Sequence, residues 1–155
     1  MTDRTVTHAT FSLEHAYNAP PSRVFAAWAD ATVKTRWFTG ATDPDMPPLE
    51  LDFRVGGTEQ TVSRGDDGRP VAVYEGLYRD IVPDERIVVA NCIDVDGERI
   101  SVSQFTAEFH PDGAGTRLVV TEQGAYLDGR ESAESRAVGI GIQLEALAAE
   151  LQESA

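Results

Sequence analysis

The sequence has few of the residues that carry covalent, redox or metal chemistry. Cys92 is its one cysteine, so no disulfide can form within the chain, which favours a reducing compartment such as the cytoplasm. Cys92 also lies in a predicted strand with no helix N-terminus or basic neighbour in sequence, and this favours a small buried apolar residue over a reactive thiol. The histidines His8, His15 and His110 are scattered without metal-ligand spacing, and we expect no metal site.

Positive charge and long apolar runs are also scarce. The 13 basic residues are outnumbered by 26 acidic ones, a formal net charge of −13, and a field of that sign repels phosphate backbones and anionic lipid surfaces. No apolar run approaches the roughly 20 residues of a membrane-spanning helix, and the N-terminal segment lacks the apolar core of a secretory signal. We therefore expect no nucleic-acid partner, no membrane partner and a cytoplasmic location.

The sequence does contain enough apolar residues for one folded core. A chain of 155 residues, 41% of them hydrophobic, is typical of a single domain and buries roughly 70% of its unfolded surface. No repeat, low-complexity tract or linker divides it, and we predict one domain over residues 1–155. Gly56-Gly57 precedes a strand-like segment instead of a helix, so it predicts a turn and not a phosphate site, and no cofactor is expected.

The first third predicts one strand followed by two short helices. Alternating apolar residues indicate a strand over 9–17, and Pro20-Pro21 ends it and starts a helix. Val24, Phe25 and Trp28 form the apolar stripe of that helix, and Asp30 is placed to cap a second helix that runs through Arg36. A loop rich in Pro and Asp is expected from 40 to 48.

The rest predicts an antiparallel sheet and one long helix. Period-two patterns and turn residues indicate strands over 49–55, 57–63, 71–81, 86–95, 99–110 and 118–122, and a loop over 124–131. From 132 to 152 the apolar residues recur at helical spacing, at Ile140, Leu144, Leu147 and Leu151. The order predicts an α+β fold in which the final helix covers one face of a curved antiparallel sheet.

Several motifs in this order resemble a known superfamily. They are A-P-x-x-R-V-F-A-A-W-A-D (19–30), the downstream Trp37, F-R-V-G-G (53–57), P-D-E-R-I-V (83–88), D-G-A-G-T-R-L (112–118) and T-E-Q-G-A-Y-L-D-G (121–129). On these residues the chain resembles the SRPBCC, or START-like, helix-grip superfamily, and within it the bacterial branch related to the activator of the heat-shock-protein-90 ATPase. The resemblance implies a sheet wrapped around the C-terminal helix with an internal cavity between them. Many relatives carry Gly-Trp where this chain has Gly139-Ile140, which implies more room here.

The candidate site residues are those predicted to face that interior. Glu122 shares the parity of Leu118 and Val120 near a strand end, and Tyr126 is close enough in sequence to pair with it. Asn91 shares the parity of Ile87 and Val89, and a buried amide must be hydrogen-bonded. The predicted ligand-binding residues are Trp28, Trp37, Phe53, Tyr74, Tyr78, Asn91, Phe105, Glu122, Tyr126, Ile140 and Leu144. A solid core that contains the same aromatic residues is the alternative.

Three functions are compatible with these residues. We favour a protein that binds a small hydrophobic or aromatic molecule. An enzyme of the cyclase or hydrolase type, with Glu122, Tyr126 and His15 as acid–base groups, is the second, although no two catalytic groups stand at a motif spacing. The resemblance alone implies the third, a partner that stimulates a chaperone ATPase. The sequence leaves open whether the chain forms a homodimer.

Overall fold

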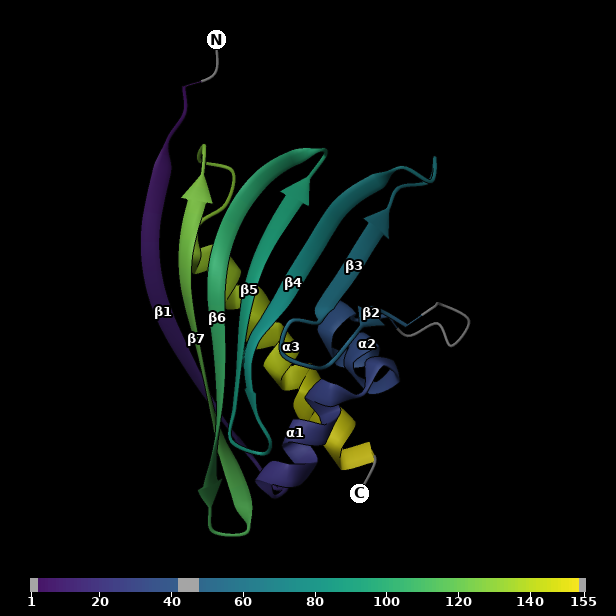
Figure 1. The fold of residues 1–155 in the computed structure, drawn as a ribbon, viewed down its shortest axis with the longest axis vertical. Coiled ribbons are helices and arrows are strands. Elements are labelled where there is room, and N and C mark those ends of the chain that lie inside the picture. Colours follow the sequence, from purple (N-terminus) through teal and green to yellow (C-terminus); the bar gives the residue numbers. More distant parts are fainter. Residues whose placement is uncertain (1–2, 42–47, 154–155) are drawn as a thin grey trace.

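A computed structural model describes residues 3–41 and 48–153. Its elements are β1 (Val6–Tyr17), α1 (Pro21–Ala29), α2 (Ala31–Thr39), β2 (Glu50–Leu51), β3 (Thr58–Arg64), β4 (Pro70–Val82), β5 (Arg86–Val95), β6 (Glu98–Asp112), β7 (Gly115–Leu127) and α3 (Ala133–Glu153). Over these residues seven strands form one antiparallel sheet in the order β1-β7-β6-β5-β4-β3-β2. The sheet curves along α3, and α1 and α2 lie beside the C-terminal half of that helix (Figure 1). The predicted α+β helix-grip fold is confirmed.

Asp30 separates the two short helices. The helix α1 has proline at its start, where the missing N–H is not needed. It ends at Ala29, and the Asp30 side chain then accepts a hydrogen bond from the Val33 amide (3.0 Å) and caps α2. Gly40, with φ 73°, terminates α2 in the left-handed conformation that glycine adopts without strain. Most of the loop predicted after it lies outside the described residues.

The long helix and the sheet bury each other's apolar residues. The predicted stripe of Ile140, Leu144, Leu147 and Leu151 is buried in the core. On β7 the alternation buries Leu118, Val120 and Glu122 together, each at most 3% exposed. Glu122 therefore points into the protein, as its parity predicts.

The strand predicted over Leu49–Val55 is mostly wrong. Only Glu50–Leu51 is a strand, although the alternation of apolar and polar residues continues beyond it. The backbone turns instead, because the amides of Arg54 and Gly57 donate to the carbonyls of Asp52 (3.0 Å) and Arg54 (2.8 Å). Gly57 is needed there, since a Cβ would lie 2.1 Å from the Asp52 carbonyl oxygen. Local turn geometry overrides the periodic pattern.

The loop predicted to begin at Gly124 begins later. The strand β7 continues to Leu127 because β1 starts at Val6, earlier than the predicted Ala9, and the extra residues pair with it. The Tyr126 ring covers Gly124, where an added Cβ would lie 2.9 Å from ring atoms. A glycine inside a strand here marks a close side-chain approach and not a break.

Cys92 is not the buried apolar residue that was predicted. Asn91 occupies the inward position of β5, so Cys92 faces the other side of the sheet and is half-buried. Partial burial raises the pKa of its thiol.

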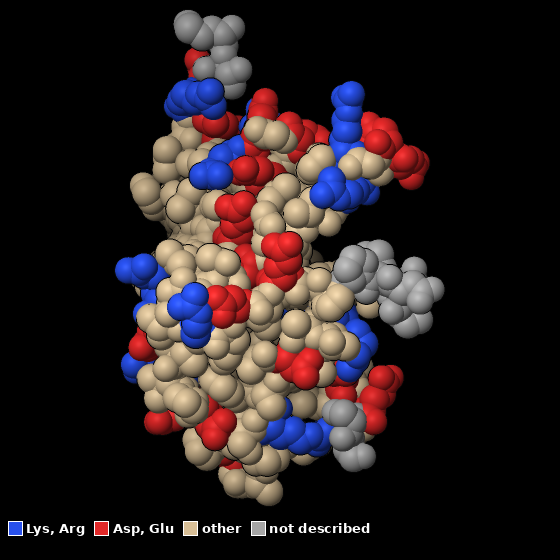
Figure 2. Space-filling view, turned by 45° about the vertical axis from the view of Figure 1, so that its right-hand side comes forward, with Lys and Arg blue, Asp and Glu red and all other residues tan. Residues whose placement is uncertain are grey.

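The described residues form no patch of a single charge on the face seen in Figure 2, and they include no helix that could span a membrane and no metal-binding cluster. On the face shown in Figure 2, acidic side chains are intermixed with arginines and do not gather in one patch. Within residues 3–41 and 48–153, no helix is long and apolar enough to cross a membrane. The same residues contain no group of three His, Cys, Asp or Glu side chains arranged to hold a metal ion.

Candidate functional site

A cavity of about 90 Å³ lies between the inner face of the sheet and the helices. Three helices and five strands border it with Trp28, Lys34, Trp37, Phe38, Glu59, Tyr74, Val89, Asn91, Ile93, Phe105, Glu122, Arg136, Ile140, Gln143 and Leu144. For comparison, an apolar cavity of about 150 Å³ admits benzene. A space of about 90 Å³ is smaller than that, so it holds a few water molecules as it stands, and a molecule of one ring requires the lining side chains to move outward.

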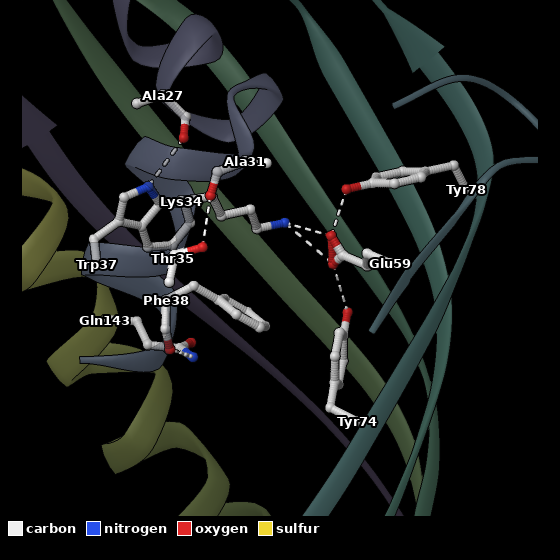
Figure 3. A network of polar contacts seen from close by, with 10 residues as sticks. All are labelled: Ala27, Ala31, Lys34, Thr35, Trp37, Phe38, Glu59, Tyr74, Tyr78 and Gln143. Atoms are coloured by element: carbon white, nitrogen blue, oxygen red, sulfur yellow. Dashed lines mark hydrogen bonds and ion pairs between the residues drawn. The ribbon is translucent and has the colours of Figure 1, made fainter. Parts of the chain in front are cut away.

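A buried ion pair forms one part of the wall. Lys34 of α2 and Glu59 of β3 are 3% and 2% exposed, and the Lys34 Nζ donates to both carboxylate oxygens at 2.6 and 3.1 Å. Tyr74 donates to Glu59 Oε2 at 3.0 Å, and Tyr78 donates to Oε1 (Figure 3). The Glu59 carboxylate thus accepts hydrogen bonds from three side chains, which is how a buried charge is stabilised.

Aromatic rings surround the Lys34 ammonium. Its Nζ lies 4.9 Å from the ring centre of Phe38, 5.3 Å from that of Trp28 and 5.9 Å from that of Trp37. Phe38 is four residues beyond Lys34 on α2, so the two share a helix face. The ring faces contribute a favourable electrostatic interaction with the cation.

The pKa values of this group follow from its contacts. Burial opposes ionisation of Glu59, but the Lys34 charge and the hydrogen bonds from Lys34, Tyr78 and Tyr74 outweigh it and lower the carboxyl pKa. Burial and the Glu59 charge raise the pKa of Tyr74 and Tyr78 well above 10.0. Glu59 is therefore ionised and both tyrosines are protonated at neutral pH.

A second ion pair, between β7 and α3, borders the same cavity. Arg136 of α3 lies over Glu122 of β7 with Nη1–Oε distances of 3.3 and 3.5 Å, and its Nη2 donates to Ser101 Oγ at 2.7 Å. Tyr126 donates to Glu122 Oε2 at 2.9 Å. The shortest distance between Arg136 and the Glu122 carboxylate (3.3 Å) is longer than that between Lys34 and Glu59 (2.6 Å), so the cation interacts less strongly with Glu122.

That difference reverses the direction of the pKa shift. Burial raises the pKa of Glu122 above its ordinary 4.5, and the Arg136 charge and the hydrogen bonds from Tyr126 and Arg136 only partly oppose it. Burial and the Glu122 charge also raise the pKa of Tyr126.

Glu59 is expected to titrate below, and Glu122 above, the ordinary glutamate pKa of 4.5. The contribution of Glu59 to stability is present above that value and is lost as the pH falls through its lowered pKa. The contribution of Glu122 is present below it and is lost as the pH rises through its raised pKa. A ¹³C NMR titration of the carboxyl carbons, assigned with Glu59→Gln and Glu122→Gln, measures both midpoints. A shared midpoint would contradict the contrast between the pairs.

Three buried polar atoms have no hydrogen-bond partner among the described residues: Trp28 Nε1, Asn91 Oδ1 and Ser103 Oγ. Asn91 and Ser103 face each other across β5 and β6, and Gly76 and Gly124 flank them on β4 and β7. The glycines offer no side chain that could pair with either oxygen. Trp28 and Asn91 border the cavity.

Most of the predicted ligand-binding residues lie around the cavity. Eight of them border it: Trp28, Trp37, Tyr74, Asn91, Phe105, Glu122, Ile140 and Leu144. Phe53 packs edge-on against Phe25 and Tyr78, whereas Tyr78 and Tyr126 lie behind the wall and donate to the two buried carboxylates. His15 is elsewhere: it stacks on Tyr17 at 4.4 Å, with its Nε2 3.3 Å from a Glu145 oxygen.

Sequence reasoning missed the charged residues of the wall. The predicted residues did not include Lys34, Glu59 and Arg136. Lysine, glutamate and arginine side chains are usually exposed, so the sequence gives no general reason to place them inside. One signal was present for Lys34, which is the only lysine of the chain and is followed by Trp37-Phe38 on the same short helix. Glu59 and Arg136 carry no comparable signal, because their partners are 25 and 14 residues away.

Comparisons with known proteins agree with this architecture. Residues 18–152 match the family described as Activator of Hsp90 ATPase homolog 1-like protein. An uncharacterised protein from Rhizobium leguminosarum is 37% identical, with a TM-score of 0.89 over 98% of this chain and 99% of that one. The Mll3558 protein from Rhizobium loti is 42% identical, with a TM-score of 0.85 over 94% of this chain and 99% of that one.

A more distant structure has the same fold. Protein CV1439 from Chromobacterium violaceum is 26% identical, with a TM-score of 0.72 over 92% of this chain and 96% of that one. No curated protein matches the sequence. The match over most of the chain, together with the helix-grip architecture, shows that this protein belongs to the Activator of Hsp90 ATPase homolog 1-like family.

Proposed function

We propose that this protein binds a small, largely apolar molecule in the cavity between the sheet and α3. The observation that supports the proposal is the composition of the wall, in which five aromatic side chains and four aliphatic ones surround a space of about 90 Å³. Pockets that bind small molecules combine such apolar walls with a few oriented polar groups. The expected ligand is no larger than one ring, and the lining side chains move outward to admit it.

Binding is better supported than acid–base catalysis. Glu122 borders the cavity with a raised pKa, which suits a general base. The other two proposed acid–base groups, Tyr126 and His15, do not border the cavity. Tyr126 lies behind the wall with a raised pKa, and His15 pairs with Glu145 instead. Because neither of these two groups borders the cavity beside Glu122, the arrangement supports an orienting role for Glu122 more than a reaction.

The proposal is tested by filling the cavity with a larger side chain on α3. Ile140 borders the cavity and is 7% exposed, so Ile140→Trp is expected to occupy the space and weaken toluene binding about tenfold or more. ¹⁵N NMR titration of wild type with toluene should shift amides next to the cavity, and the variant should show smaller or no shifts. The matched control is Ile142→Trp, because Ile142 is 66% exposed on the same helix and its replacement leaves the cavity unchanged.

Two results would count against the proposal. The first is a wild-type protein whose cavity-lining amides do not respond to toluene or to phenol of the same size. The second is a folded Ile140→Trp variant that binds toluene as well as wild type does. Thermal unfolding checks folding, since overpacking of this kind typically costs 1–3 kcal/mol.

A further inference from the structure

We propose that the cavity selects a neutral molecule that carries a hydroxyl or carboxamide group, and that Asn91 accepts the hydrogen bond of that group. This inference rests on the proposed function and specifies the chemistry of its ligand. Three features support it: the charge balance of the wall, the unpartnered oxygen of Asn91 and the unpartnered N–H of Trp28.

The charges in the wall already balance. Among the described residues that line the cavity, Lys34 is paired with Glu59 and Arg136 with Glu122, so two cations face two carboxyls. Arg136 also lies 3.9 Å from Glu131, which is not part of the lining, so no unpaired cation remains in the described wall. A charged ligand would enter as an excess buried charge, and burying an unpaired ion is strongly unfavourable. The wall therefore excludes ions of both signs and favours a neutral molecule.

Asn91 presents a hydrogen-bond acceptor that nothing else in the described structure uses. Its side chain is 7% exposed and borders the cavity, and its Oδ1 has no partner among the described residues. Its cross-strand neighbours are Gly76, which has no side chain, and Ser103, whose own oxygen is unpartnered. Buried polar groups are normally hydrogen-bonded, so the unpartnered oxygen of an amide whose side chain borders the cavity supports a polar ligand group beside it.

Trp28 presents the complementary group. Its indole is 4% exposed and borders the same cavity, and its Nε1 is likewise without a partner among the residues the structure describes. A hydroxyl or carboxamide group can both donate and accept a hydrogen bond, whereas a purely apolar ligand can do neither. The rest of the ligand is apolar, because Phe105, Ile140 and Leu144 complete the wall.

Three probes of equal size test the inference on the wild-type protein: toluene, phenol and N-methylpyridinium. We expect phenol to bind about tenfold or more tightly than toluene, because only phenol donates a hydrogen bond. N-methylpyridinium, an isosteric cation, is expected not to bind. Equal affinity for toluene and phenol, or binding of the cation, would overturn the inference and leave the proposed function standing. No binding of toluene or phenol would instead reject the proposed function itself.

A variant pair assigns the preference to Asn91. Asn91→Leu replaces the amide with an apolar group of similar size and is expected to abolish the preference for phenol while retaining toluene binding. Ser103→Ala is the matched control, since it removes the adjacent unpartnered oxygen, which does not border the cavity. A preference that persists in Asn91→Leu, or that disappears in Ser103→Ala, would contradict the role of Asn91. Thermal unfolding verifies that both variants fold.

Discussion

Replacing Lys34 with methionine is expected to lower the free energy of unfolding by about 3–5 kcal/mol. The substitution keeps the length of the side chain but removes the cation from Glu59, which is 2% exposed. The carboxylate is then a buried charge without a counter-ion, held only by the hydroxyls of Tyr74 and Tyr78. Urea unfolding at neutral pH, monitored by circular dichroism, measures the loss.

Two comparisons separate this effect from a general loss of charge. Arg54→Met breaks an ion pair with Asp52 on an exposed surface and is expected to cost about 1 kcal/mol or less. Lys34→Met combined with Glu59→Gln removes both charges and is expected to recover part of the loss. A Lys34→Met variant no less stable than Arg54→Met would contradict the buried pair.

The same variant has a predictable pH dependence. Without the charge and hydrogen bonds of Lys34, less opposes the effect of burial, so the pKa of Glu59 should be higher in the variant than in wild type. A carboxylate whose folded pKa is higher contributes less stability at a pH above that pKa, and the difference disappears once the carboxyl is protonated in both proteins. The deficit of Lys34→Met is therefore largest at neutral pH and shrinks in acid.

Replacing Trp28 with alanine is expected to lower the free energy of unfolding by about 3–5 kcal/mol. The indole is 4% exposed, and its ring centre lies 4.8 Å from that of Trp37, 6.0 Å from that of Phe105 and 5.9 Å from that of Phe109. Its Nε1 has no partner among the described residues, so no hydrogen bond is lost. The loss comes from packing and from the enlarged cavity, and chemical denaturation measures it.

A pair of conservative variants tests that explanation. Trp28→Phe retains a ring and loses only contact area. Trp37→Phe also removes the hydrogen bond from Trp37 Nε1 to the Ala27 carbonyl (3.0 Å), and an unsatisfied buried acceptor costs about 1–3 kcal/mol. Trp37→Phe should therefore be the more damaging of the two. Equal losses would show that the hydrogen bond contributes nothing.

The side of the sheet on which a residue lies was predictable wherever a strand is long. The period-two pattern places Glu122 and Asn91 inside, and the helical period of α3 buries Ile140 and Leu144. Both periodicities are properties of the local backbone, so they can be derived from neighbouring residues alone. The pattern failed at 52–57, where hydrogen bonds within a turn replaced pairing with a neighbouring strand.

By itself the sequence determined the order of the elements, the inward faces of the long strands and helix, and the family. Only the tertiary structure decided which polar groups meet inside. Lys34 and Glu59 come together because α2 lies near β3, and Arg136 reaches Glu122 because the first turns of α3 lie beside β7. The Asn91 Oδ1 has no hydrogen-bond partner in the described part of the chain, because strand register places Gly76 and Ser103 beside it. Register and helix packing are set by contacts between distant segments, and no local pattern contains them.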